Sequence, residues 1–167
     1  MRPVVLFCLL ILTACSAPGP ELIVPEPLPV LAGPVSRSAT LSGDVVLSDD
    51  VRVLPGVELV LAPGTTVWVR PAGSTKIEPD QLSARTEILV EGSLVLAGRP
   101  GAPVRFRLLK PPLPVPDDDP LWGGVLVLSG GQVRMSDVEI DRAEHGLWLL
   151  GGKAEVTRLD ARNCRYG

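Results

Sequence analysis

The sequence predicts an all-β protein, and three observations lead to that prediction. From about residue 38 onward, short apolar runs rich in valine, leucine and isoleucine recur roughly every 6 to 10 residues. These runs are too short for helices, and their β-branched residues favour strands. Pro-Gly and Gly-Gly pairs between the runs supply turns. The C-terminal part also repeats itself at a spacing of about 21 residues.

The expected strands follow from the apolar runs. They are Val45–Leu47, Val57–Leu61, Thr66–Val69, Ile88–Val90, Leu94–Leu96, Val104–Phe106, Val125–Val127, Val133–Met135, Val138–Ile140 and Leu147–Leu149. Two polar or proline-rich stretches, residues 70–86 and 109–121, lack this periodicity. They are therefore expected to be loops that project from the strands.

The internal repeat predicts how the strands stack. Residues 130–146 align with residues 151–167 at an offset of 21, and residues 124–128 align with 146–150 at an offset of 22. A period of about 21 residues with three short strands is what one coil of a parallel β-helix requires, because stacked coils bury a continuous inner face. Without the loops, about 100 residues remain. The predicted fold is therefore a single-stranded solenoid of roughly five coils.

Three segments resemble a known kind of domain. They are PGVELVLAPGTTVWV (55–69), ILVEGSLVLAGRPGAPVRF (88–106) and WGGVLV (122–127). They resemble the right-handed parallel β-helix domains of bacterial exported proteins, which have the pectin-lyase-like architecture. The resemblance covers about residues 40–167 and implies the right-handed fold. It leaves function open, because this fold carries lyases, hydrolases, adhesins and passive scaffolds.

The N-terminus predicts a targeting segment over residues 1–14. Arg2 is followed by nine apolar residues, Val4–Leu12, a run that suits a signal peptide and is too short to span a bilayer. Leu12-Thr13-Ala14-Cys15 resembles the bacterial lipobox, which implies cleavage before Cys15 and lipidation of its thiol with palmitate-type chains. The alternative is an ordinary signal peptide with an incidental cysteine. By the same resemblance, Ser16 favours the outer over the inner membrane.

The predicted domain boundaries follow from composition. Residues 15–37 contain six prolines and are expected to form an extended tether, with a reach of roughly 65 Å, or a leader without a specific role. Residues 38–167 are the predicted β-helix domain, expected to be incomplete at its C-terminal end. Gly167 aligns with Gly146, which leads into Leu147–Leu149. The open β edge predicts a fragment of a longer helix, self-association or a protein partner.

Acidic residues provide two candidate sites. Asp117, Asp118 and Asp119 could bind Ca²⁺, but three consecutive carboxylates rarely aim at one point, so a solvated loop is the alternative. The second group is Asp137, Glu139, Asp141 and Asp160, which share one strand face with Arg158 and Arg162. At the offset of 21, Asp137 faces Arg158 and Asp141 faces Arg162, so the interleaved arginines favour an ion-pair ladder over a catalytic carboxylate pair.

Other reactive or aromatic side chains are few. His145 is expected at a turn, aligned with Gly123 and Tyr166, and Cys164 is expected to be a small inward-facing residue aligned with Ala143. Trp148 could stack on a sugar ring or pack. Trp122 is either a core residue or a surface contact. Trp68 is expected to point outward if Val67 and Val69 point inward, which makes it the better surface-contact candidate.

Composition narrows the function classes. The formal net charge of −3 argues against a nucleic-acid partner, and a single histidine argues against a histidine-rich metal site. No catalytic residue and no cofactor is predicted. We expect a lipid-anchored structural or interaction module at the bacterial cell envelope, in contact with the membrane through its lipid. The alternative is a carbohydrate-active or polysaccharide-binding protein.

Overall fold

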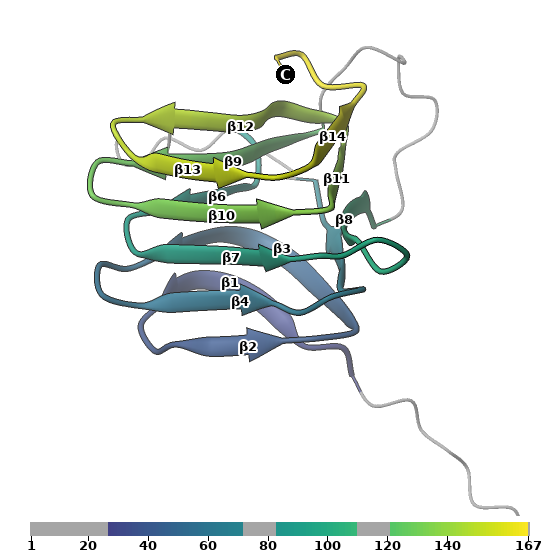
Figure 1. Cartoon of the computed structure of the whole chain (residues 1–167), viewed down its shortest axis with the longest axis horizontal. Coiled ribbons are helices and arrows are strands. Elements are labelled where there is room, and N and C mark those ends of the chain that lie inside the picture. Colours follow the sequence, from purple (N-terminus) through teal and green to yellow (C-terminus); the bar gives the residue numbers. More distant parts are fainter. Residues whose placement is uncertain (1–26, 72–82, 110–120, 167) are drawn as a thin grey trace, which may run out of the picture.

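A computed structural model describes residues 27–71, 83–109 and 121–166, and its regular structure in these ranges consists of β-strands (Figure 1). The strands are β1 (Val30–Val35), β2 (Ala39–Leu41), β3 (Asp44–Val53), β4 (Glu58–Leu61), β5 (Thr66–Val69), β6 (Glu87–Val90), β7 (Ser93–Ala97), β8 (Val104–Leu108), β9 (Trp122–Leu128), β10 (Gln132–Ser136), β11 (Val138–Asp141), β12 (Ala143–Leu150), β13 (Lys153–Val156) and β14 (Leu159–Arg162). All ten predicted runs coincide with strands, apart from Val57, which precedes β4, so the all-β prediction is confirmed. None of the described residues forms a helix with the length and apolar character needed to cross a membrane.

The strands form two mostly parallel sheets. The larger sheet follows the order β12-β9-β6-β3-β5-β8-β11-β14, with β1 also paired to β3. The smaller sheet follows the order β13-β10-β7-β4-β2. Figure 1 shows the strands of the smaller sheet stacked one above another across the front of the molecule. Segments far apart in sequence therefore become neighbours in each sheet.

The predicted fold class, a single-stranded right-handed β-helix of roughly five coils, is wrong. The strands instead form the two sheets described above, and the eight-strand path of the larger one is a nearly closed barrel. The physical reason lies in β3, a ten-residue strand whose Val46 pairs with Trp68 on β5 and whose Val51 pairs with Ile88 on β6. The first part of β3 thus pairs with β5 and its last part with β6, so one continuous strand links β5 and β6 in the same sheet.

The spacing between paired strands is also uneven. In the smaller sheet, Leu94 pairs with Val133, whereas Val133 pairs with Ala154 after a much shorter stretch of chain. The longer interval contains residues 109–121, which the sequence predicts to be a loop. The sequence separation between paired strands is therefore not constant, and an estimate of coil number from a constant period fails for this chain.

The register predicted from the repeat is nevertheless confirmed at its core. Val138 pairs with Leu159 at an offset of 21, and Leu147 pairs with Val125 at an offset of 22. A register shift between His145 and Leu147 accounts for the change of offset. The aligned Gly130 and Gly151 both have a positive φ, 86° and 85°, which only glycine adopts without strain.

The ordered β structure begins within the segment assigned to the tether. Strand β1 pairs in parallel with β3, with Val30 opposite Val46, and Leu31 is buried in the core. Pro34 is accommodated because β1 has a neighbour only on one side among the described strands. The sheet therefore starts before residue 38. Cys15 and the rest of residues 1–26 lie outside the described residues.

The core lies between the two sheets, where the inward residues of successive strands stack. Side chains alternate along each strand, so every second residue points inward. The largest completely buried side chains are Trp122 and Phe106, whose rings stack at a centroid distance of 5.3 Å. The rest of the core is mainly valine, leucine and isoleucine.

Candidate functional site

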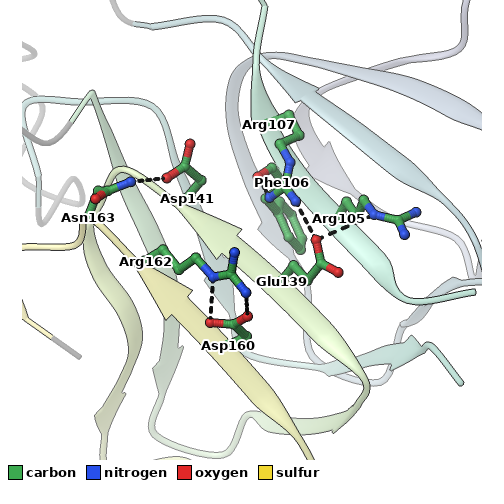
Figure 2. Close-up of polar contacts among 8 residues, drawn as sticks. All are labelled: Arg105, Phe106, Arg107, Glu139, Asp141, Asp160, Arg162 and Asn163. Carbon is green, nitrogen blue, oxygen red and sulfur yellow. Dashed lines mark hydrogen bonds and ion pairs between the residues drawn. The ribbon is translucent and has the colours of Figure 1, made fainter. Parts of the chain in front are cut away.

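A group of charged side chains covers the outer face of β8, β11 and β14. Val138 and Ile140 of β11 point into the core, so Glu139 and Asp141 between and after them point outward. The parallel register places Glu139 beside Arg105 on one neighbour and Asp160 on the other. Three strands distant in sequence therefore bring carboxylates and guanidinium groups together (Figure 2).

Arginines neutralise these carboxylates. Glu139 forms ion pairs with Arg107 and with Arg105, whose Nε lies 3.4 Å from Glu139 Oε2. Asp137 pairs with Arg158, one repeat further along the chain. Of the predicted ion pairs, the one between Asp137 and Arg158 is thus confirmed, and Asp137, Glu139 and Asp160 each have an arginine partner.

One predicted pair in this ladder is wrong. The register does place Asp141 opposite Arg162, as expected. Arg162 nevertheless binds Asp160 on its own strand, and Asn163 Nδ2 donates a hydrogen bond to Asp141 Oδ1 at 2.8 Å (Figure 2). Residues two apart on a strand lie on the same face, so a long arginine side chain can reach along the strand as well as across it.

The ladder fixes the charge of Asp160. The hydrogen bond from Arg162 lowers the pKa of the Asp160 carboxyl, and the charges of Arg162 and Arg107 act in the same direction. A general acid at neutral pH needs a raised pKa, which a desolvated carboxyl acquires. Asp160 has the opposite environment and is suited to a permanent negative charge.

A groove of about 390 Å³ lies beside the ladder. It is lined by Arg99, Pro100, Gly101, Pro103, Arg105, Asp137, Val138, Glu139, Arg158 and Asp160. One wall is a tight turn between β7 and β8, in which Arg99 and Ala102 form an antiparallel bridge, and Figure 1 shows the chain looping out there. Sequence reasoning missed this groove, although Pro100-Gly101 signals the turn.

Close packing holds the base of that turn in place. A Cβ atom added to Gly98 would collide with the backbone oxygens of Ser136 and Asp137. Asp137 itself has a positive φ of 46°, which is uncommon for a residue other than glycine. The glycine therefore allows the turn to lie directly against the corner between β10 and β11.

The two tryptophans proposed as surface contacts have different environments. Trp122 is completely buried, and its Nε1 donates a hydrogen bond to the backbone oxygen of Asp141 at 2.9 Å. The core alternative therefore holds for Trp122, and it is not available as a surface contact. Val67 and Val69 point inward as expected, and Trp68 between them is partly exposed.

His145 lies in β12 and not in a turn. It pairs with Gly124, not with Gly123, because the register shift comes after His145. Its ring stacks on Trp148 at 4.2 Å and on Tyr166 at 4.9 Å between centroids. The histidine is thus held between two aromatic rings in a packing role, and Trp148 also packs.

Cys164 has the character expected of a packing residue. It is partly buried against the core, and burial raises the pKa of its thiol. A raised pKa disfavours the nucleophilic thiolate. The inward-facing alternative for Cys164 is therefore supported.

A second polar group, which the sequence analysis missed, is buried near the start of β6. Glu87 is completely buried, and its backbone N–H donates to Asp50 Oδ1 at 3.0 Å. Nearby, Ser83 Oγ donates to Glu144 Oε2 at 2.9 Å. Both Glu87 and Ser83 pack against Gly123, where a Cβ atom would collide with them. No periodicity marks a glutamate at the start of a strand as buried.

Apolar side chains are exposed on the last layer of strands. Leu149, Val156 and Tyr166 are exposed, and Ala154, Leu159, Ala161 and Cys164 are partly exposed. We call these seven residues the end surface. The contrast with the preceding layer is sharp, since Met135 is 1% exposed and its partner Val156 is 45% exposed.

Two candidate sites from the sequence lie outside the described residues, namely the lipidation site Cys15 and the possible Ca²⁺ ligands Asp117, Asp118 and Asp119. Within residues 27–71, 83–109 and 121–166, no group of three or more histidine, cysteine, aspartate or glutamate side chains is arranged to hold a metal ion.

Comparison with known proteins gives no relative: no family model, no curated protein and no solved structure matches this chain.

Proposed function

We propose that this protein is a lipid-anchored component of the bacterial cell envelope whose β domain associates with further copies of itself. The observation that carries the proposal is the end surface, where apolar residues are exposed at positions that are buried one layer earlier. Covering such residues removes apolar area from water, which favours association.

The occupant we propose is the opposite end of a second copy. Among the described strands, β13 pairs only with β10 at the C-terminal end of the smaller sheet, and β2 pairs only with β4 at the other end. Every ladder within that sheet is parallel. Placing β2 of one copy beside β13 of another would continue the parallel ladder and satisfy unpaired backbone groups. Leu28 and Val30, just before and at the start of β1, are also exposed.

Association of this kind is head to tail, so it builds open chains of copies and not closed dimers. Sedimentation velocity of the full chain over a wide concentration range should show a growing series of oligomers. Val156→Lys, which places a charge in the end surface, should shift the series towards monomer. Arg134→Lys, on β10 and away from the end surface, is the matched control. A monomer at every concentration would contradict the proposed self-association.

The anchor is tested separately. The motif Leu12-Thr13-Ala14-Cys15 supports acylation of Cys15. Cells that express the wild type should incorporate a fatty-acid probe into the protein, and Cys15→Ser should abolish the label. Equal labelling of the two proteins would contradict the lipid anchor without affecting the association result.

A further inference from the structure

The lining of the groove beside the ladder is balanced in charge, but arginines outnumber carboxylates once the flanking side chains are included. Its lining contains three arginines and three carboxylates. Two more arginines reach those carboxylates from the flanks, Arg107 at Glu139 and Arg162 at Asp160. Asp141 is not part of the lining and is bonded to Asn163. Each carboxylate is therefore already paired, and the surplus charge is cationic.

Two of these arginines, Arg99 and Arg105, have N–H donors that the carboxylates do not use. Arg99 is exposed, and no carboxylate pairs with it among the residues that the structure describes. Arg105 lies with its Nε 3.4 Å from Glu139 Oε2, a long contact, and its side chain is about one-third exposed. A guanidinium group has five N–H donors, so most of those on Arg99 and Arg105 are left for a ligand.

We propose that this groove binds a phosphate or sulfate group, with Arg99 and Arg105 as the principal ligands. Guanidinium groups donate two parallel hydrogen bonds to such an oxyanion. The groove volume of about 390 Å³ fits a small molecule that carries the anion. The closely packed turn at Gly98 fixes the backbone next to Arg99, and the ion-paired Glu139 lies beside Arg105. This proposal does not depend on self-association or on the lipid anchor.

The test is a titration of the full chain with inorganic phosphate and, separately, inorganic sulfate at low ionic strength, followed by NMR. Saturable shifts are expected at the amides of the groove and at the Nε resonances of Arg99 and Arg105. Arg99→Gln and Arg105→Gln should each weaken binding about tenfold, the effect of losing a charge-assisted pair of hydrogen bonds. Arg105→Lys should retain part of the affinity because it keeps the charge.

Arg134→Gln is the matched control. Arg134 lies on the smaller sheet, is exposed, and forms an ion pair with Glu58 of the same sheet. This variant should bind both anions like the wild type. Shifts that do not saturate, or equal weakening by Arg99→Gln and Arg134→Gln, would overturn the proposal. Circular dichroism of each variant verifies that a loss of binding is not a loss of fold.

The source of the anion is decided by a second arm. Vesicles of phosphatidylcholine with and without phosphatidylglycerol are sedimented with wild type, Arg99→Gln and Arg134→Gln, each in a Cys15→Ser background so that an N-terminal lipid does not hold the protein on both kinds of vesicle. Selective loss of binding to the anionic vesicles in Arg99→Gln identifies a lipid headgroup as the source. Equal vesicle binding by all three proteins, together with the expected anion titration, identifies a free phosphate or sulfate compound.

Discussion

At the scale of single residues, the contribution of an apolar side chain to the free energy of unfolding depends on whether its strand has neighbours on both sides. Met135 and Val156 stand opposite each other in the parallel ladder of β10 and β13. Met135 has covered neighbours on both sides, because β10 also pairs with β7. Val156 has a described strand on one side only. Chemically similar positions therefore differ in how much apolar surface they bury.

This difference predicts unequal effects of two matched truncations. Met135→Ala should lower the free energy of unfolding by about 2–5 kcal/mol, the usual range for a buried large-to-small change. Val156→Ala should lower it by less than about 1 kcal/mol, because its side chain is already half exposed. Urea unfolding followed by circular dichroism measures both values. Equal losses would show that the end surface is covered in solution.

At the scale of elements, a forked ion pair connects β3 with the turn after β6. Arg52 donates from Nε at 3.0 Å and from Nη2 at 2.8 Å to the two carboxylate oxygens of Glu91. The hydrogen bonds from Arg52 lower the pKa of the Glu91 carboxyl below its ordinary value. Neighbouring strands are thus joined by a charge-assisted contact in addition to their backbone ladder.

This pair predicts a pH-dependent contribution to stability. Because the folded-state pKa of Glu91 is lowered, the pair stabilises the fold above the ordinary glutamate pKa of about 4.3 and loses its effect as pH falls through the folded-state value. Glu91→Gln should therefore be less stable than wild type at pH 7, by up to about 1 kcal/mol for a partly exposed pair. The difference should close in acid.

Urea unfolding of wild type and Glu91→Gln at a series of pH values measures this gap. Glu155→Gln is a suitable control, because Glu155 is exposed on β13 and has no ion pair among the described residues. A Glu91→Gln gap that persists unchanged at pH 2 would mean that it arises from packing and not from charge.

The elements also show what the sequence pattern could and could not predict. The alternation of Val67, Trp68 and Val69 was sufficient to place Trp68 on the face opposite the two valines, because strand periodicity is local, and the structure shows that the valines face the core. Strand β1 was missed because Pro34 and its proline-rich surroundings favour an extended tether. Its pairing with β3 is a tertiary contact that overrides that preference.

The candidate site also has features that the sequence could predict and features that it could not. The opposition of Asp137 and Arg158 followed from a repeat offset of 21, which is information contained in the sequence. The partners of Asp141 and Arg162 were not predictable, because several arginine and asparagine side chains compete for the same carboxylates. The groove depends on the three-dimensional position of the turn at Arg99, which no periodicity records.

At the scale of the whole molecule, the smaller sheet is a linear sequence of neighbouring strands. Among the described strands, each of its members pairs only with its immediate neighbours in the order β13-β10-β7-β4-β2. In assemblies of this type, stability is close to a sum of contributions from each layer and from the interfaces between adjacent layers. Layers with one neighbour should therefore open more readily than layers with two.

This arrangement predicts a gradient of hydrogen exchange along the stack. Strand β6 lies between β9 and β3, and β7 lies between β10 and β4. The amides of β6 and β7 should therefore exchange only through global unfolding. Amides of β13 and β14 should exchange faster by local opening, because each pairs with a single strand in the part of the chain that the structure describes. Measurement at low and high protein concentration separates two causes of protection. If copies associate through the end surface, protection of β13 should rise with concentration in wild type and stay low in Val156→Lys. Uniform protection of all strands at low concentration would instead show that the two sheets unfold as a single unit.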